Sequence, residues 1–505
     1  MTAREGLAMV PPQVFRAGPL PRTAVSDAQW QDLAGDLARG DLVLLGLWAE
    51  VGAVHMALLD PAARTVGIAT VGAASGRFPS VGRLHAPAQR PERAIADLFG
   101  LVPEGAADDR PWLDHGCWEV THPLGAAAPR HQPGPDPYAF LPVTGESLHQ
   151  VPVGPVHAGI IEPGHFRFTA QGETVVRLEE RLGYVHKGIE RLMQGATLAR
   201  GAELAGRTSG DSTVAYAWAF SQAAEAALGA EVPARATWLR GLMAELERLA
   251  NHLGDIGAIC NDAAFAMMLA QCSMLRERVL RTADTCFGHR FMRDRIVPGG
   301  VAADLDRSGI AALRALLDEV RTKFPPLAAL YENTASLQDR TVGTGRLAAE
   351  LARRFGAGGH VGRASGRDFD TRRDLSYAPY DRLTFAVPVR SGGDVDARVW
   401  IRIEEVGQSL GLIAQILDRL PEGPLLAPLP AAGARREGLG LVESFRGDVL
   451  VWLALDEGGA IARCHLRDPS WFQWPLLEAV IENNIIADFP LCNKSFNCSY
   501  SGHDL

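Results

Sequence analysis

Apolar residues recur at helical spacing through four long stretches of the chain. In residues 234–259 they return every three or four positions, at Leu239, Leu242, Met243, Leu246, Leu249 and Leu253. This spacing places apolar side chains on one face of a helix. It predicts helices over 234–259, 263–287, 310–333 and 399–420, and we expect Pro325 and Pro326 to break the third.

Shorter apolar runs bounded by turn residues predict β-strands in three parts of the chain. Near the N-terminus, 41–50 and 54–72 are predicted strands with a turn at Asp60 and Pro61, followed by a helix that starts near Pro91. Residues 151–181 predict a hairpin or meander that turns at Gln171 and Gly172. Residues 439–457 and 460–469 predict a strand pair.

These elements group into two domains joined by a proline-rich segment. Residues 126–148 contain five prolines, a density that neither a helix nor a central strand tolerates, and they predict an extended linker. The pattern therefore predicts an α+β protein. Its small α/β domain is expected at 1–125, and a large, mainly helical domain with antiparallel β edges is expected at 149–505.

Composition and charge exclude several classes of ligand. The 505 residues carry a net charge of -9 and no basic run, so nucleic acid is not an expected partner. No apolar run reaches the ~18–20 residues of a membrane span, and the N-terminus lacks the apolar core of a signal peptide. We expect a cytoplasmic protein that reaches a membrane only through partner subunits.

The seven cysteines are scattered and form no CxxC pair. Structural zinc sites and four-cysteine iron–sulfur sites use closely spaced cysteines. The spacing therefore predicts free thiols in a reducing compartment and no metal bound by this chain.

Polar residues that can carry chemistry concentrate between 149 and 220. Glu162 and His165 are one such pair, because a histidine beside a carboxylate can move protons near neutral pH, but a hairpin could equally expose both to water. His186 and Glu190 stand four residues apart and would share one face of a helix. They would then be either part of a proton path or an exposed pair.

Two further polar stretches allow two interpretations each. The small polar residues of RTSGDS, at 207–212, either cap a helix or keep a cavity open. The alternating charges of RASGRDFDTRRD, at 363–374, are typical of a solvated loop, but in a buried setting they would form guanidinium–carboxylate pairs. The chain has no Walker-type phosphate loop and no nucleophile elbow.

The order of the motifs resembles one protein superfamily. VPVGPVH, EPGHFR, ERLGYVHKGIE, MAELERLANHL, PGGVAADL, RASGRDFDTRRD and IRIEEVGQSL follow one another along the chain. Together they resemble the large subunit of membrane-bound energy-converting nickel–iron hydrogenases and the homologous quinone-site subunit of respiratory complex I. ERAIADLFGLVPEG resembles the small accessory subunit of complex I, so the two are fused here, as in formate-hydrogenlyase-type hydrogenases.

The hydrogenase resemblance implies two pairs of cysteine ligands. The first pair, in Cys-Gly-x-Cys, follows an arginine that matches Arg207, and its two positions hold Ser209 and Ser212. The second pair lies near the C-terminus, where its positions hold Ser499 and Gly502. A nickel–iron site needs soft thiolates, which a hydroxyl does not replace. Cys498, one position early, could restore at most one ligand, so we expect no nickel–iron centre.

The complex I resemblance implies a quinone pocket with a histidine on the hairpin and a tyrosine after the arginine. His165 matches the histidine, the tyrosine position falls on Gly210, and Tyr216 is the candidate replacement. Arg207 matches an arginine beside the terminal cluster of the neighbouring subunit. The resemblance thus implies an iron–sulfur small subunit that carries a 4Fe–4S cluster, and antiporter-like membrane subunits.

These observations predict a nickel-free subunit of an oxidoreductase complex, which binds no cofactor by itself. A quinone or another small acceptor would enter a cavity whose expected lining is Glu162, His165, Ser209, Ser212, Tyr216 and Ser499. His186 and Glu190 would extend the proton path. The family also implies NAD-linked oxidoreductase activity, although the sequence has no NAD-binding motif. The alternatives are a coupling subunit without chemistry of its own and an active hydrogenase.

Overall fold

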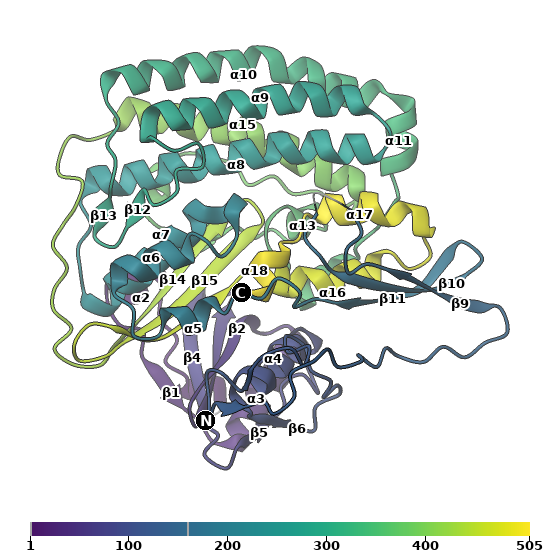
Figure 1. The fold of residues 1–505 in the computed structure, drawn as a ribbon. Coiled ribbons are helices and arrows are strands. Elements are labelled where there is room, and N and C mark those ends of the chain that lie inside the picture. The colour runs from purple at the N-terminus through teal and green to yellow at the C-terminus, as the bar shows by residue number, and fades with distance from the viewer. Residues whose placement is uncertain (1–2, 159–160) are drawn as a thin grey trace.

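The computed structural model describes residues 3–158 and 161–505, and its small domain is built on a four-stranded sheet (Figure 1). The strand order is β1 (Arg22–Ala24), β4 (Thr65–Gly72), β3 (Ala53–Asp60) and β2 (Val43–Glu50). Only the β1–β4 pair is parallel. Helices α3 (Asp27–Arg39) and α4 (Gln89–Phe99) complete this domain. Helix α3 starts at a capping box of Ser26 and Gln29, which satisfies its first N–H groups.

The small domain shares a hydrophobic core with the large one. Its sheet packs against a second, antiparallel sheet of β14 (Arg436–Ser444), β15 (Gly447–Leu455) and β16 (Ile461–Arg467). Trp48 of β2 and Trp452 of β15 lie with ring centroids 5.5 Å apart. The predicted strand pair is therefore three strands, because the chain turns at Phe445 and Arg446.

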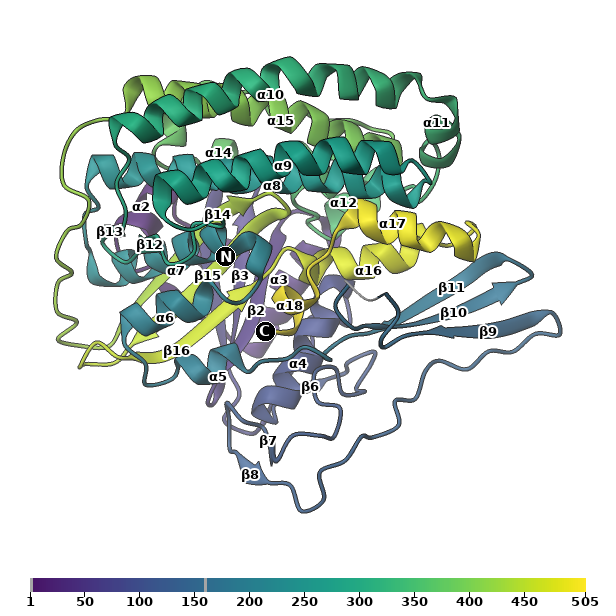
Figure 2. The ribbon, with the colours of Figure 1, turned by 45° about the horizontal axis from the view of Figure 1, so that its top comes forward.

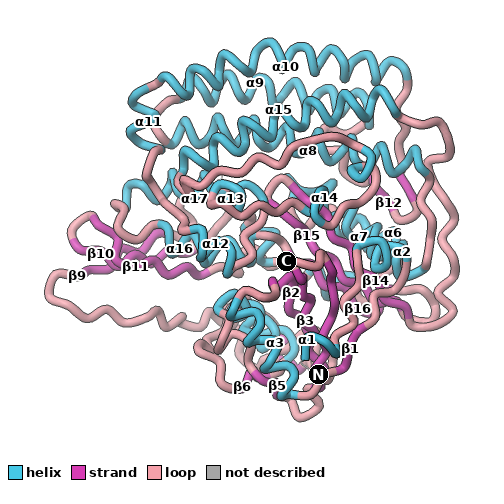
Figure 3. The backbone as a smooth tube through the Cα atoms, turned by 180° about the vertical axis from the view of Figure 1, so that it is seen from behind, coloured by secondary structure: helices cyan, strands magenta, loops and turns pink. Residues whose placement is uncertain are grey.

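Four long helices form the upper layer of the large domain (Figures 1 and 3). They are α8 (Ala234–Asp262), α9 (Ala266–Phe287), α10 (Arg307–Asn333) and α15 (Val395–Arg419). The helices predicted from apolar spacing are confirmed, but the break at Pro325 and Pro326 is wrong. Both prolines face solvent, so water can reach the carbonyls that lose an N–H partner, while Phe324 and Tyr331 remain packed in the core.

Helix α7 (Thr213–Leu228) lies directly on β14, between the upper helices and the β14–β16 sheet. This close approach requires glycine. A Cβ on Gly440 would stand 1.9 Å from the carbonyl oxygen of Ala219, and one on Gly438 would stand 2.0 Å from that of Ala223. Helix α7 thereby fixes the segment just before it, which contains Ser209 and Ser212.

A three-stranded meander projects from the large domain (Figure 2). It consists of β9 (Leu148–Val153), β10 (His165–Gln171) and β11 (Thr174–Arg181), with the predicted turn at Gln171 and Gly172. Residues 159 and 160 of the predicted meander lie outside the described residues. The chain ends in α16 (Ser470–Val480), α17 (Phe489–Phe496) and α18 (Tyr500–Asp504), and α18 packs against α16.

The predicted α+β class is confirmed, and the proline-rich segment 126–148 runs as an extended chain with one two-residue strand. None of the described helices combines the length and the apolar character that crossing a membrane would need. The remaining helices and strands are α1 (Ala3–Gly6), α2 (Pro12–Ala17), β5 (Arg77–Pro79), β6 (Val102–Glu104), β7 (Val120–Thr121), β8 (Ala128–Pro129), α5 (Ile189–Met193), α6 (Leu198–Ala205), β12 (Ile296–Val297), β13 (Gly300–Val301), α11 (Ala335–Thr341), α12 (Ala349–Arg354), α13 (Gly359–Ala364) and α14 (Thr371–Asp374).

Candidate functional site

Three serines from two distant parts of the chain meet in the interior of the large domain, and we call Ser209, Ser212 and Ser499 the serine cluster. Ser209 and Ser212 flank the short 3₁₀ turn before α7, and Ser499 caps the N-terminus of α18. The hydroxyl oxygens of Ser209 and Ser499 are 2.8 Å apart, and the Ser499 oxygen also accepts a hydrogen bond from the Gly502 amide at 2.8 Å. All three serines are buried.

An ion pair closes one side of the serine cluster. Asp211 accepts hydrogen bonds from the Ser209 hydroxyl at 2.8 Å and from Arg446 Nη1 at 2.8 Å. The same Arg446 nitrogen lies 3.1 Å from the Ser212 hydroxyl. Burial would raise the pKa of Asp211, but the Arg446 charge outweighs it and lowers that pKa. The buried hydroxyls of Ser209 and Ser212 therefore have partners within the chain.

Tyr216 and Asp468 form a second polar contact, close to Ser499 and Gly502. The buried Tyr216 hydroxyl donates to Asp468 Oδ2 at 2.8 Å, and Asp468 Oδ1 accepts from the Ser470 amide at 2.8 Å. Burial, assisted by the Asp468 charge, raises the pKa of Tyr216 well above its ordinary value, so the hydroxyl stays protonated. A Cβ on Gly502 would stand 2.4 Å from Asp468 Oδ2, so no side chain fits at this position without displacing Asp468.

These residues do not fit a nickel–iron centre. The four positions that the hydrogenase resemblance assigns to thiolates supply three hydroxyl groups and a glycine, and hydroxyls are hard donors. Cys498 is buried, and burial raises the pKa of its thiol well above the ordinary value, which disfavours the thiolate that a metal requires. Within residues 3–158 and 161–505, no group of three or more His, Cys, Asp or Glu side chains is arranged to hold a metal ion.

Arg207 and Gly210 lie beside the serine cluster. Arg207 holds Asp294 in a bidentate pair, with N–O distances of 2.7 and 2.8 Å, and its side chain is 36% exposed. Gly210 starts the 3₁₀ turn, and a Cβ there would meet no atom within 4 Å. Arg207 therefore offers a charged surface next to the buried serines, whereas Gly210 leaves open space.

Glu162 and His165 do not form the predicted pair, and among the described residues neither side chain hydrogen-bonds to a member of the serine cluster. Glu162 is exposed and accepts a hydrogen bond from the Ser501 amide at 3.0 Å. His165 begins β10, where its ring lies 4.8 Å from that of Phe140 and accepts from Arg167 Nε at 3.3 Å. The strand pairing of β10 separates the two side chains, because it fixes His165 in the meander while Glu162 precedes the strand.

The prediction that His186 and Glu190 share one face of a helix is also wrong. Gly188, in the left-handed conformation at φ 67°, stands at the N-cap of α5, so His186 precedes the helix. The Nδ1 of His186 lies 2.6 Å from the carbonyl oxygen of Asp504, and its ring stacks on Trp118. Both residues nevertheless line one pocket of about 310 Å³ with mainly apolar walls.

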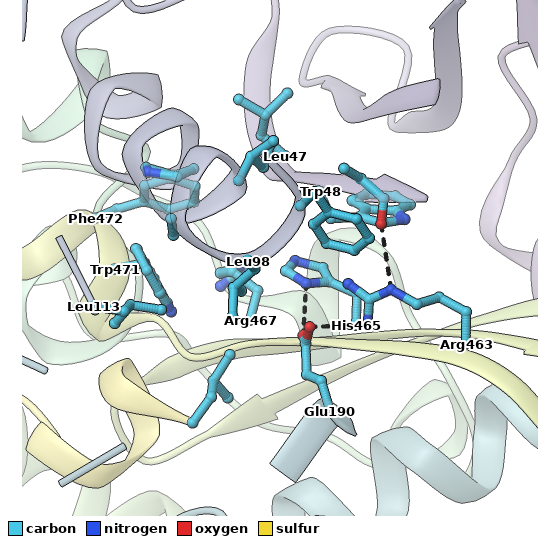
Figure 4. A pocket seen from close by; sticks show the side chains of 16 residues that line it. Leu47, Trp48, Leu98, Leu113, Glu190, Arg463, His465, Arg467, Trp471 and Phe472 are labelled. Carbon is cyan, nitrogen blue, oxygen red and sulfur yellow. Dashed lines mark hydrogen bonds and ion pairs between the residues drawn. The ribbon is translucent and has the colours of Figure 1, made fainter. Parts of the chain in front are cut away.

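Glu190 points into a second, smaller cavity between the two domains (Figure 4). It pairs with Arg463 at 2.8 Å and with His465 Nδ1 at 2.9 Å. Burial would raise the pKa of Glu190, but the charges of Arg463 and His465 lower it to about 2. Because burial also lowers the pKa of His465, Arg463 is the partner that keeps Glu190 ionised at neutral pH. The cavity holds about 30 Å³, enough for one or two waters.

The charged stretch 363–374 is buried, so the solvated-loop interpretation is wrong for its central residues. Arg363 pairs with Glu443 at 2.9 Å, and it also pairs with Glu405. Arg372 pairs with Asp370 at 2.7 Å and with Glu245 at 3.0 Å. Glu245, Glu405 and Glu443 come from α8, α15 and β14, and a local charge pattern does not reveal such distant partners.

The sequence pattern missed three buried residues around the serine cluster: Arg446, Asp468 and Glu247. Glu247 of α8 accepts hydrogen bonds from the Val214 and Ala215 amides, at 2.7 and 3.2 Å, at the N-terminus of α7. Burial raises its pKa to about 8. The sequence offered one signal of these buried residues, which is a charged residue inside an apolar run. Arg446, between two strand-like apolar segments, is an example.

Comparisons with known proteins agree with this architecture. Residues 49–133 match the family of the 30 kDa subunit of the respiratory-chain NADH dehydrogenase, and residues 262–436 match that of its 49 kDa subunit. Formate hydrogenlyase subunit 5 of Escherichia coli is 32% identical over 436 residues, which cover 85% of this chain and 77% of the relative. The carbon monoxide-induced hydrogenase of Rhodospirillum rubrum is 32% identical over 356 residues, which cover 70% of this chain and 98% of that protein.

A solved structure shows the same fold. A chain of the membrane-bound sulfane sulfur reductase, an archaeal respiratory membrane complex, superposes with a TM-score of 0.67 at 26% identity, covering 71% of this chain and 99% of that chain. The chain therefore belongs to the family that comprises the large subunits of membrane-associated, energy-converting hydrogenases and the 49 kDa subunit of the respiratory-chain NADH dehydrogenase, with a domain of the 30 kDa type fused ahead of it.

Proposed function

We propose that this chain is a nickel-free subunit of a membrane-associated oxidoreductase complex and that its interior couples a partner's redox reaction to a membrane arm. The serine cluster is the observation that carries this proposal. Three hydroxyls and a glycine occupy the positions of the expected thiolates, and the direct 2.8 Å contact of Ser209 with Ser499 leaves no space for a ligand between them. A closed, hydrogen-bonded interior suits a subunit that transmits a change of shape better than one that binds a substrate here.

The partners of this proposal are those that the family resemblance implies. An iron–sulfur small subunit with a 4Fe–4S cluster would contact the surface around Arg207, and antiporter-like membrane subunits would hold the chain at the inner face of the membrane. Arg207 supports the first contact, because its guanidinium is fixed by Asp294 and still reaches the surface. Electrons would stay on the cluster of the partner subunit. This chain would change shape in response to the charge of that cluster.

A second candidate function is electron transfer from the partner cluster to a quinone or another small acceptor. The pocket of about 310 Å³ favours it, because its mainly apolar walls contain His186 and Glu190. A quinone headgroup needs hydrogen-bond donors in an otherwise apolar pocket, and Lys187 and Arg191 of the same lining supply them, since the ionised Glu190 only accepts. In this version, protons would reach the acceptor from that pocket and not from the serine cluster.

The deciding experiment is the nickel and iron content of the intact complex, purified without oxygen. We expect no nickel, with iron at the level of the partner clusters. Nickel near one atom per complex would overturn the proposal and favour the active hydrogenase. A quinone titration of the same preparation then separates the two candidates, since saturable quinone reduction that His186→Gln weakens would favour the acceptor function.

A further inference from the structure

Six arginines line a pocket between the two domains, and we call this pocket the arginine basin. It holds about 780 Å³ and is formed by the end of α3, the turn between β3 and β4, helix α12 and residues 366–375. Figure 3 shows α3 and α12 on the side of the molecule where the basin lies. Its arginines are Arg39, Arg64, Arg353, Arg354, Arg367 and Arg373.

The positive charges of the basin exceed its negative charges. Three carboxylates, Glu350, Asp368 and Asp374, also line it. Arg64 and Arg373 pair with Asp374 at 3.6 and 2.9 Å. Arg39 also has carboxylate partners, on its own helix and the following turn. The excess is unusual in a chain of net charge -9, and it comes from the three remaining arginines.

Those three are Arg353, Arg354 and Arg367, and within residues 3–158 and 161–505 none has a carboxylate oxygen within 4 Å. Arg353 and Arg354 are exposed on α12. Unpaired, exposed guanidinium groups on one wall of a pocket are free to bind an anion.

Arg367 shows that the basin is more than a patch of surface charge. It is only 9% exposed, and the one hydrogen bond of its side chain in the described chain runs from Nη1 to the Ala357 carbonyl at 3.0 Å. Its guanidinium lies 4.4 Å from the ring centre of Phe369, which orients it. Burial lowers the pKa of Arg367, and the more distant charges of Asp448, Glu443 and Asp374 offset this only in part. A buried charge of this kind is costly until a counterion binds.

We propose that the arginine basin binds a phosphate-bearing organic anion, with Arg353, Arg354 and Arg367 as its phosphate ligands. A guanidinium fork matches two phosphate oxygens at once. The basin lies within the roughly 300–1,000 Å³ typical of small-molecule sites. The accessible apolar residues of its wall, Ala38, Val43 and Pro61, would receive the organic part of the ligand.

The test is direct calorimetric binding of ADP, inorganic pyrophosphate and adenosine to the purified full chain. We expect ADP and pyrophosphate to bind, and adenosine to bind at least about tenfold more weakly, because it lacks the charge-assisted hydrogen bonds. The double variant Arg353→Gln/Arg354→Gln should weaken ADP binding about 100-fold, or tenfold for each arginine. Arg281→Gln is the matched control, since Arg281 is 73% exposed on α9, away from the basin, and should leave binding unchanged.

Three results would overturn the proposal: neither the two phosphate compounds nor vesicles containing phosphatidylglycerol bind, the double variant binds ADP as the unaltered chain does, or ADP binds the isolated chain but not the intact complex. Vesicles containing phosphatidylglycerol distinguish the source of the phosphate. If vesicles bind through the same arginines and ADP does not, the organic anion is a lipid headgroup. If ADP binds the isolated chain but not the intact complex, an acidic segment of a partner covers the basin, and a small-molecule site is ruled out.

Discussion

The buried hydroxyls of Ser209 and Ser499 have partners within the chain, whereas three guanidinium groups of the arginine basin have no carboxylate partner among the described residues. Both regions are polar, and both lie against apolar core. A polar group that is satisfied internally stabilises the fold and loses a hydrogen bond if a ligand enters. A charged group that the fold leaves unpaired gains a hydrogen bond when a ligand binds to it. The comparison therefore separates polarity that maintains structure from polarity that can bind a ligand.

The largest expected effect comes from breaking the ion pair of the serine cluster. Arg446→Gln should lower the free energy of unfolding by about 3 kcal/mol, because Arg446 is buried and its loss removes the counter-charge of the Asp211 carboxylate and a hydrogen bond to the Ser212 hydroxyl. Urea unfolding of the full chain measures this. The exposed control Arg281→Gln should change it by less than about 0.5 kcal/mol. Equal effects of the two variants would contradict a structural role for the pair.

A smaller effect is expected at Gly502, the position that the hydrogenase resemblance assigns to the fourth thiolate ligand. Gly502→Ala should lower the free energy of unfolding by about 2 kcal/mol, because the new Cβ would stand 2.4 Å from Asp468 Oδ2. Gly407→Ala in α15 is the matched control, since a Cβ there meets no atom within 4 Å and should stabilise by up to about 1 kcal/mol. If Gly502→Ala were neutral, the site would have room for a side chain after all.

The raised pKa of Glu247, next to the serine cluster, predicts that the stability of the fold depends on pH. Its pKa is about 8 in the folded chain and 4.5 ordinarily, so between these pH values only the folded state holds the proton. Stability should therefore fall as pH rises through this window, by at most about 1.4 kcal/mol per pH unit. Glu247→Gln should remove this part of the slope in urea unfolding at pH 5, 6.5 and 8. An unchanged slope would assign the pH dependence to another group.

The smallest effect on stability is expected in the arginine basin. Arg353→Gln/Arg354→Gln should change the free energy of unfolding by less than about 0.5 kcal/mol, because both side chains are exposed and unpaired. ADP should raise the melting temperature of the unaltered chain and not that of the variant. A loss of several kcal/mol without ligand would show that these arginines hold the two domains together instead.

The sequence predicted most of the fold, because helical spacing and turn residues act locally. It also singled out Ser209, Ser212 and Ser499, because a family motif is local as well; the fold brings the three together, and their role as a site stays a prediction. It did not predict what surrounds them: Arg446 lies 235 residues from Asp211, and only the folded chain brings the two together. The solvated-loop interpretation of residues 363–374 was wrong for the same reason, because the burial of this stretch depends on carboxylates from other elements.

The core shared by Trp48 and Trp452 has a consequence for assembly. Families that are described as two separate subunits, of 30 and 49 kDa, are here one polypeptide whose sheets pack face to face. The two parts are made in a fixed one-to-one ratio, and their meeting does not depend on concentration. The small domain is thus part of the same folding unit as the large one. A cell that makes this chain needs one fewer subunit association to assemble the complex.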